Sequence, residues 1–213
     1  MLPGNFRYVT PIIAASAQPL NTAQVQALKE NGIHSVVILV TRHELDTNPL
    51  ISRNEYFEAL ARNGIRVYHI PIRHLSVPSN KQLRFITQLF QTNERYGRKT
   101  LVHCLLGTGR TGAVIAAYLI GKGYLLEQAA RMVQGNEPNI MKFPESFKQE
   151  EFLKQLEREH PILKHLVPPP KRRTRELLNR LRERIKTVIA RRPGTHHPKR
   201  NHTNNQKQRP KPR

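Results

Sequence analysis

The sequence predicts an α/β domain with a mostly parallel central sheet flanked by helices, followed by a basic C-terminal tail. Short β-branched runs alternate with helical segments of about 10 to 16 residues through residue 156, which favours a sheet covered on both faces. The charge is also uneven. Residues 168–213 hold 16 of the 36 lysines and arginines but only two of the 15 acidic residues, whereas residues 1–167 hold nearly all of the apolar periodic segments.

Each element is predicted by its periodicity and its end signals. Alternation and β-branching predict four strands before the central motif, at residues 6–9, 12–15, 36–40 and 66–70. A helix over residues 22–30 ends before Gly32, and a second helix follows the capping pattern Ser52–Glu55 and ends at Gly64. Ser79 begins a third helix that extends through Phe90. Two further helical stretches are predicted between residue 125 and residue 156.

A single cysteine, Cys104, follows the predicted strand at residues 100–102 and precedes a glycine-rich loop, Arg110 and an apolar helix. A loop between a strand end and a helix N-terminus points successive backbone N–H groups at one place, so it can bind an anion. Arg110 would add a two-pronged donor suited to phosphate, and the positive field would stabilise Cys104 as a nucleophilic thiolate. A buried structural cysteine before a tight turn would leave Arg110, Thr111 and the glycines unexplained. The pattern therefore predicts attack by sulfur on phosphorus.

A second motif overlaps this loop. Residues 107–112 also satisfy Gly-x-Gly-x-x-Gly, the dinucleotide-binding fingerprint. That fingerprint requires a second strand after the helix, with an acidic residue about 20 positions on. Residues 125–133 instead have helical spacing, and Arg110 inside the turn would hinder close packing against a pyrophosphate. Nucleotide binding is thus the poorer interpretation, and no cofactor is predicted.

The run from His103 to Gly112, His-Cys, five residues and Arg-Thr-Gly, resembles the signature of the cysteine-dependent protein tyrosine phosphatase superfamily. Residues 5–160 as a whole resemble a small atypical dual-specificity phosphatase, most clearly at residues 5–19 and 69–72. The chain has no tryptophan, which separates it from the tyrosine-specific phosphatases with a Trp-Pro-Asp loop. The resemblance implies a three-layer phosphatase domain over residues 1–167. It also implies hydrolysis of phosphomonoesters through a phosphocysteine intermediate.

The resemblance implies a role for each matching residue. Cys104 matches the nucleophile, Arg110 the guanidinium that binds the phosphoryl oxygens, and Thr111 the hydroxyl that hydrogen-bonds the thiolate. His103 matches the imidazole that orients the cysteine backbone, and Gln149 matches a glutamine that positions the hydrolytic water. The expected phosphate-binding residues are Leu105, Leu106, Gly107, Thr108, Gly109 and Arg110.

The acid loop departs from the family pattern. The family places an aspartate about thirty residues before the cysteine, but that position holds His74, and Asp46 is the only aspartate in the chain. His74 can itself be the proton donor; alternatively no side chain donates and only good leaving groups react, or the protein binds phosphate without turnover. Loss of general acid–base catalysis lowers the reaction rate by about 10²- to 10⁴-fold. This favours a slow enzyme that prefers phosphotyrosine. Residues 105–109 contain no lysine or arginine, which favours a phosphorylated protein over a polyphosphorylated inositol lipid.

Composition excludes several other classes. No apolar run reaches the roughly 20 residues of a transmembrane helix, and residues 1–7 lack the pattern of a secretory signal. One cysteine permits no internal disulfide, and no Cys/His spacing indicates a metal. The expected location is the cytoplasm, or the nucleus in a eukaryotic source because of the basic tail.

The basic tail is predicted to have two parts. Three prolines, residues 168–170, separate the domain from an amphipathic segment that carries ten basic residues and two glutamates before residue 193. Together with these prolines it forms the unit 168–192, which is predicted to be a basic amphipathic helix, and residues 193–213 are predicted to be disordered. Residues 171–213 suit an anionic partner, which can be RNA, an acidic protein or a membrane surface. The apolar side of the helix can equally pack on the phosphatase domain. The alternatives that follow are an RNA 5′-phosphatase and a phosphate-binding scaffold without catalysis.

Overall fold

The structure is a computed structural model in which residues 1–135 and 143–160 are described. The chain divides into two compact units, Met1–Pro169 and Pro170–Arg213. The predicted basic helix at residues 168–192 and the predicted disordered tail at residues 193–213 both lie outside the described residues.

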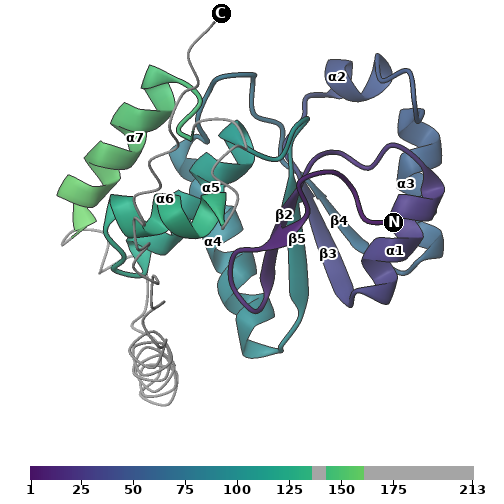
Figure 1. Cartoon of the computed structure of the whole chain (residues 1–213), viewed down its shortest axis with the longest axis horizontal. Coiled ribbons are helices and arrows are strands. Elements are labelled where there is room, and N and C mark those ends of the chain that lie inside the picture. The colour runs from purple at the N-terminus through teal and green to yellow at the C-terminus, as the bar shows by residue number, and fades with distance from the viewer. Residues whose placement is uncertain (136–142, 161–213) are drawn as a thin grey trace, which may run out of the picture. The chain divides into compact units, whose positions relative to one another are not determined.

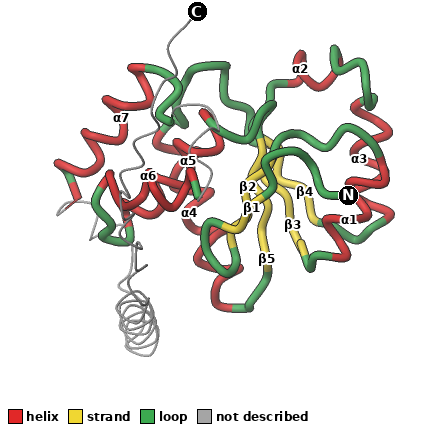
Figure 2. Tube along the Cα trace, viewed as in Figure 1, coloured by secondary structure: helices red, strands yellow, loops and turns green. Residues whose placement is uncertain are grey.

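The centre of the described region is a five-stranded sheet (Figures 1 and 2). The strands are β1 (Arg7–Tyr8), β2 (Ile13–Ser16), β3 (Ile33–Ile38), β4 (Arg66–His69) and β5 (Lys99–His103). Their order is β1-β2-β5-β3-β4, and every pair is parallel except β1 with β2. The predicted mostly parallel sheet is therefore confirmed. The short antiparallel hairpin at its edge corresponds to the two strands predicted on either side of Pro11.

Seven helices are described, and they flank the sheet on both sides (Figure 1). On one side lie α1 (Thr22–Glu30) and α3 (Arg53–Arg62), and on the other lie α4 (Asn80–Arg95) and α5 (Gly109–Gly121). The helices α6 (Leu126–Gln134) and α7 (Phe147–Arg158) pack against α5. The short helix α2 (Arg42–Asp46) follows β3. This is the three-layer arrangement that alternating strands and helices favour.

Two apolar clusters form the core, one on each face of the sheet. Val36 and Ile38 of β3 belong to the cluster beneath α1 and α3, whereas Val37 between them belongs to the cluster beneath α4 and α5. In the same way, Leu101 and Val102 of β5 point to opposite faces, as successive strand residues do. Both faces of the central strands are buried, which explains why their sequences are continuous apolar runs rather than alternating ones.

The helix ends follow the predicted signals closely. Ser79 and Gln82 complete a reciprocal capping box at α4, with the Ser79 hydroxyl accepting from the Gln82 N–H at 3.3 Å. At α3 only one half of the predicted capping box is formed: the Ser52 hydroxyl accepts from the N–H of Glu55 at 3.2 Å. Gly32 takes a φ of 78° after α1, a left-handed conformation that favours glycine.

The observed elements differ from the predicted ones in two places, in the bounds of β3 and in the helix that follows it. The strand covers residues 33–38 rather than 36–40, because Leu39 and Val40, although buried, already lead into the N-cap of α2 at Thr41. The helix α2 itself was not predicted. It has five residues, of which only Leu45 is buried, so it produces no apolar periodicity.

Candidate active site

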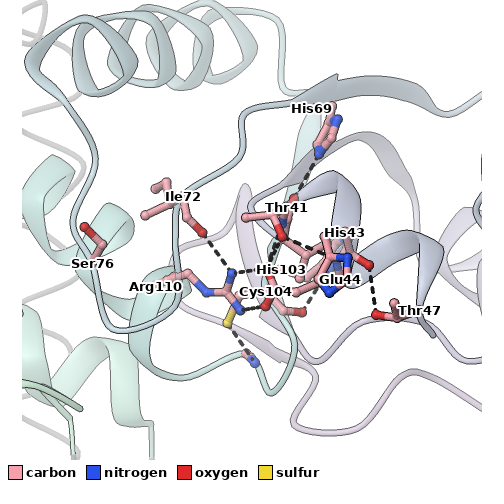
Figure 3. A network of polar contacts seen from close by, with 12 residues as sticks. Thr41, His43, Glu44, Thr47, His69, Ile72, Ser76, His103, Cys104 and Arg110 are labelled. Atoms are coloured by element: carbon pink, nitrogen blue, oxygen red, sulfur yellow. Dashed lines mark hydrogen bonds and ion pairs between the residues drawn. The ribbon is translucent and has the colours of Figure 1, made fainter.

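The nucleophile candidate Cys104 directly follows β5, where three parallel strands end together. His103 is paired in register with Ser16 at the end of β2 and with Ile38 at the end of β3. Cys104 is 4% exposed, and its Sγ accepts a hydrogen bond from the N–H of Gly107 at 3.3 Å (Figure 3). The sheet therefore places the sulfur at the carboxyl edge of its central strand, the usual ligand-binding edge of such a sheet.

Residues 104–110, the Cys104–Arg110 loop, are held from outside through their carbonyl groups. The Leu105 carbonyl accepts from the N–H of Gln18 at 3.1 Å, the Leu106 carbonyl from Asn5 Nδ2 at 2.9 Å, and the Gly107 carbonyl from Arg7 Nη2 at 3.0 Å. These donors all come from the N-terminal segment around β1 and β2. Within the described residues, the N–H groups of Leu105, Leu106 and Thr108 make no hydrogen bond. Carbonyls fixed on the outside leave these N–H groups unpaired within the described residues, which is the arrangement that an anion-binding loop requires.

Gly107 is required by the path of this loop. Its φ is 78°, and a Cβ at this position would overlap the carbonyl group of Ser16, with Ala17 N at only 2.6 Å. The overlapping atoms belong to the backbone of β2 and the residue after it, so they cannot move aside. The loop can therefore lie this close to the sheet edge only with glycine at position 107.

Arg110 is buried. Some of its N–H groups donate to other protein atoms, and the others lie along one free edge of the guanidinium. Its Nη1 donates to Glu44 Oε2 at 2.8 Å and to the Ile72 carbonyl at 2.9 Å, and its Nη2 donates to Glu44 Oε1 at 2.7 Å (Figure 3). A guanidinium has five N–H donors in a fixed planar arrangement. Within the described residues, the Nε–H and one Nη2–H of Arg110 make no hydrogen bond. These two donors share one edge, which suits two oxygens of a phosphoryl group.

Glu44 is the acidic partner of this guanidinium, and the sequence analysis did not select it. It is the third residue of α2, and its carboxylate also accepts from the N–H and hydroxyl of the N-cap Thr41, both at 2.8 Å. Burial raises the pKa of Glu44, but the hydrogen bonds from Arg110 and Thr41 and the charge of Arg110 outweigh it and lower the pKa to about 2. The signal was present in Thr41–Glu44, which matches the capping-box pattern.

His103 connects the nucleophile to the opposite face of the sheet. Its Nδ1 lies 3.1 Å from the Cys104 carbonyl, which can only accept, so Nδ1 carries the proton. Its Nε2 then accepts from the Tyr56 hydroxyl at 2.8 Å. Complete burial lowers the pKa of His103 to about 4, and the charge of Arg110 adds to this effect. The imidazole is therefore neutral near pH 7, and it is hydrogen-bonded to the Cys104 carbonyl.

Of the three remaining expected residues, His74 is exposed, whereas Thr111 and Gln149 are buried. His74 lies in an exposed turn and makes no hydrogen bond or ion pair with the rest of the described chain. Thr111 is fully buried, but within the described residues its hydroxyl makes no hydrogen bond, including none to the sulfur. Gln149 is also fully buried rather than on a surface helix face. Its Oε1 accepts from the Glu145 N–H at 3.0 Å and its Nε2 donates to the Ser76 carbonyl at 3.4 Å.

Arg7 is a second guanidinium close to the loop that sequence reasoning missed. Besides the Gly107 carbonyl, it donates to Val133 O at 2.5 Å and to Asn5 O at 2.9 Å. Burial lowers the pKa of Arg7, and a negative charge on Cys104 acts in the opposite direction. An arginine in a two-residue edge strand carries no sequence signal for such a role, because only the sheet order brings β1 near the loop.

The described residues contain no cluster of three or more histidine, cysteine, aspartate or glutamate side chains that could hold a metal ion. None of the helices described in residues 1–135 and 143–160 is long and apolar enough to cross a membrane.

Comparison with known proteins places this arrangement in a family. A family model described as "Polymorphic toxin system, DSP-PTPase phosphatase" matches residues 14–124. The crystal structure of Tk-PTP in its active form is 31% identical, with a TM-score of 0.60, and the match covers 74% of this chain and 99% of that chain. Kinase associated phosphatase is 20% identical with a TM-score of 0.65, covering 76% of this chain and 98% of that chain.

The core catalytic domain of the PP-IP phosphatase SIW14 from S. cerevisiae is 18% identical with a TM-score of 0.54, covering 79% of this chain and 98% of that chain. The similarities to kinase associated phosphatase and SIW14 concern the fold alone, whereas the family model at residues 14–124 includes the strand, loop and helix that carry Cys104 and Arg110. The chain therefore belongs to the polymorphic toxin system DSP-PTPase phosphatases, a family of atypical dual-specificity phosphatases in the cysteine-dependent protein tyrosine phosphatase superfamily.

Proposed function

We propose that the protein hydrolyses phosphomonoesters through a phosphocysteine intermediate and prefers phosphotyrosine in proteins. One observation carries the proposal. Within the described residues, the N–H groups of Leu105, Leu106 and Thr108 make no hydrogen bond, and they lie with the Cys104 sulfur and the free edge of Arg110 in residues 104–110, which lead from β5 into the first turn of α5. A phosphoryl group bound there has its oxygens paired with donors and its phosphorus next to the sulfur.

The first step is displacement at phosphorus by the Cys104 thiolate. A bond forms between sulfur and phosphorus while the ester oxygen leaves, and the negative charge on the phosphoryl oxygens stays paired with Arg110 and the loop N–H groups. Glu44 keeps the guanidinium in place through two hydrogen bonds that do not use its free edge. His103 fixes the Cys104 carbonyl and thereby the direction of the sulfur.

The second step transfers the phosphoryl group from sulfur to water. The buried hydroxyl of Thr111, which makes no hydrogen bond within the described residues, is available to the sulfur as it leaves. Gln149 uses one of its two amide N–H donors on Ser76, so the other remains available to orient the attacking water. These two roles are proposals that match what the resemblance implies for Thr111 and Gln149.

The preference for phosphotyrosine depends on the leaving group and on the rim of the site. A phenolate leaves more readily than an alkoxide, so hydrolysis of an aryl ester depends less on a proton donor, and this chain lacks the aspartate that the family usually provides. Leu105 and Leu106 of the loop are 46% and 44% exposed, and Leu75 of the neighbouring turn is 43% exposed. Apolar side chains at these positions suit a phenyl ring more than a polyphosphorylated inositol.

The test is release of inorganic phosphate from an aryl phosphate and from phosphotyrosine, phosphoserine and inositol-phosphate substrates compared at equal concentration. We expect phosphotyrosine to be hydrolysed fastest and Cys104→Ser to abolish release. The matched control is Ser35→Ala, a buried hydroxyl in β3 whose partners are Thr100 and Asn93 and which lies outside the loop. Phosphate release that persists in Cys104→Ser would contradict the proposal, as would turnover of phosphoserine at the rate of phosphotyrosine.

The two alternative functions, an RNA 5′-phosphatase and a phosphate-binding scaffold, depend on the basic residues 171–213 and can be tested by removing them. A chain ending at Val167 is compared with the full chain for phosphate release from aryl phosphate and from triphosphorylated RNA, and for RNA and anionic-vesicle binding at two salt concentrations. We expect equal turnover of the aryl phosphate and loss of salt-sensitive binding in the shorter chain. Faster hydrolysis of the RNA than of phosphotyrosine by the full chain would favour the RNA 5′-phosphatase. Binding without any turnover would favour the scaffold.

The family description also suggests a biological setting, which we propose here for this chain: a toxin that removes phosphate from molecules of the cell in which it acts. Expression of the chain in a bacterial host tests this. We expect growth inhibition by the parent and none by Cys104→Ser at the same protein level. Equal growth of the two strains would contradict this setting while leaving the phosphatase activity untouched.

A further inference from the structure

The proposed reaction needs a proton for the leaving group, and the described carboxyl groups differ in their ability to supply it. Asp46, the only aspartate in the chain, is paired with Arg53 at 2.5 Å and with Arg42 at 3.5 Å. Glu44 is held in two hydrogen bonds to Arg110. Neither group can approach an ester oxygen without breaking these contacts.

We propose that Glu145 supplies this proton, because its carboxyl group lies against the Cys104–Arg110 loop at Gly109. A Cβ built on Gly109 would overlap the Glu145 carboxylate, with Glu145 Cδ at 2.8 Å and Cβ at 3.0 Å. Gly109 immediately precedes Arg110, and the glycine leaves room for the carboxylate at that point. Glu145 is half-buried, so part of its side chain is open to solvent.

The segment that carries Glu145 is fixed on both sides of it. Phe143 packs on α5, where a Cβ on Gly112 would lie 2.5 Å from its ring. After Glu145, the Ser146 hydroxyl donates to the Leu75 carbonyl at 2.9 Å, while the N–H of Glu145 itself donates to Gln149 Oε1 at 3.0 Å. Gln149 in turn donates to Ser76 at 3.4 Å. These contacts pin the segment between α5 and the turn around Leu75.

Electrostatics support the same placement. The Glu145 charge is among the groups that raise the pKa of Arg110, although burial of Arg110 acts in the opposite direction and is the larger single effect. The carboxyl group is therefore close enough to the guanidinium to interact with it, yet it makes no ion pair with it. A carboxyl group that is near the phosphate site but not paired there can exchange protons with the substrate.

The chemistry balances over the two steps, and it rests on the proposed phosphocysteine mechanism. In the first step, the sulfur–phosphorus bond forms, the phosphorus–oxygen bond of the ester breaks, and protonated Glu145 gives its proton to the departing oxygen, which leaves as an alcohol or phenol. In the second step, the Glu145 carboxylate takes a proton from the water that attacks phosphorus, the sulfur–phosphorus bond breaks, and inorganic phosphate and the Cys104 thiolate are formed. Glu145 ends as the acid it was at the start.

His74, the alternative donor from sequence, makes no hydrogen bond or ion pair within the described residues and lies in an exposed turn. If Glu145 is the proton donor, its substitution should slow the poor leaving groups most. If His74 is the donor, substitution of His74 should do so. The two candidates are compared by measuring kcat/KM for a series of aryl phosphates whose phenols differ in pKa, together with one alkyl phosphate. The variants are Glu145→Gln, Glu145→Asp and His74→Ala. The control is Glu151→Gln on α7, a half-buried carboxylate that contacts Lys154 at 3.4 Å.

In Glu145→Gln, we expect kcat/KM to fall by about 10²-fold or more on the poorest leaving groups and by less than about tenfold on the most activated phenol. Glu145→Asp keeps a carboxyl group on a shorter arm, so its dependence on the leaving group should return toward that of the parent. Glu151→Gln and His74→Ala should match the parent.

The dependence of kcat/KM on the leaving group also shows whether a negative result concerns the role of Glu145 or the proposed function on which that role rests. A Glu145→Gln variant with the parental dependence, or with the same loss on every substrate, would overturn the role of Glu145, and a steepened dependence in His74→Ala would assign the role to that residue. In both cases the parent still releases phosphate and the proposed function stands. Absence of phosphate release by the parent from even the most activated ester would instead refute the proposed function.

Discussion

At the scale of single residues, the division of the Arg110 donors is the feature that most determines the site. Glu44 and the Ile72 carbonyl take three of the five N–H groups, which fixes the guanidinium plane and leaves one edge for a phosphoryl group. A buried arginine without a carboxylate would pay a large desolvation cost, so Glu44 stabilises the charge as well as its direction. The carboxylate of Glu44 is thus part of the site together with Arg110.

Replacing Glu44 with glutamine should therefore impair catalysis without changing the shape of the side chain. The amide has one oxygen acceptor and no charge, so it cannot accept both Arg110 hydrogen bonds. We expect kcat/KM for an aryl phosphate to fall about 10- to 100-fold, which corresponds to the roughly 1.5–3 kcal/mol of a hydrogen bond to a charged group. The control is Glu58→Gln on α3, which removes an exposed ion pair with Arg62 at 3.9 Å. An unchanged kcat/KM in Glu44→Gln would show that Arg110 needs no carboxylate.

At the scale of elements, the loop after β5 keeps its shape because the N-terminal segment holds it from outside. Asn5 and Arg7 bind the carbonyls of Leu106 and Gly107, and the backbone of Gln18 binds that of Leu105. Two segments about a hundred residues apart in sequence thus cooperate, since β2 is the direct neighbour of β5 in the sheet.

Arg7→Met tests this bracing, because methionine keeps an apolar stem and removes all three hydrogen bonds of the guanidinium. We expect a loss of about 1.5–3 kcal/mol in the free energy of unfolding and weaker competitive inhibition by inorganic phosphate. Both are measured directly, by urea unfolding and by inhibition kinetics. Arg66→Met, at an exposed position at the start of β4, is the matched control. An Arg7→Met protein that binds phosphate as tightly as the parent would argue against a role in shaping the loop.

A pair of glycines tests how closely the loop lies against β2. Gly97 and Gly107 both have positive φ, 62° and 78°, but a Cβ on Gly97 meets nothing within 4 Å whereas one on Gly107 overlaps Ser16. Alanine at position 97 should cost about 1–2 kcal/mol for the left-handed backbone alone. Alanine at position 107 should cost roughly a further 1–3 kcal/mol from overpacking and should lower activity. Equal melting temperatures for the two variants would mean that the loop is not tightly packed on the sheet.

At the scale of the whole molecule, the buried groups of the site make stability depend on pH. Burial lowers the pKa of His103 from 6.5 to about 4, so the unfolded chain binds a proton between these values that the folded chain does not. Stability must then fall as the pH drops from about 6.5 toward 4. The pKa of Glu44, lowered from 4.5 to about 2, adds a loss of the same sign in the lower range.

We expect the free energy of unfolding at pH 4.5 to be lower than at pH 7, by an amount on the order of 3 kcal/mol or less. The measurement is urea unfolding at a series of pH values, with His103→Gln as the variant that should flatten the upper part of the profile. His34→Gln replaces an exposed histidine of β3 and should leave the profile unchanged. A His103→Gln profile as steep as that of the parent would contradict this assignment.

Much of the fold and part of the site could be predicted from the sequence, because the signals were local. The strand, loop and helix around Cys104 place the proposed nucleophile, Arg110 and the backbone donors within seven consecutive residues. The apolar runs and caps predicted the strands and six of the seven described helices, and with them the parallel sheet. These features depend on neighbours in the chain, so a single sequence contains them.

The tertiary structure alone decided which charged groups surround that loop. Glu44 lies on a helix too short for periodicity, Arg7 on an edge strand of two residues, and Glu145 between two helices. In the sequence each resembles an ordinary solvated charge, since the partner of a charged side chain is set by strand order and helix packing. The sequence by itself determined the candidate nucleophile and the loop that we propose binds phosphate. The fold determined which carboxylate fixes the guanidinium, which arginine braces the loop and which acid lies against Gly109, because those contacts join segments that only the folded sheet brings together.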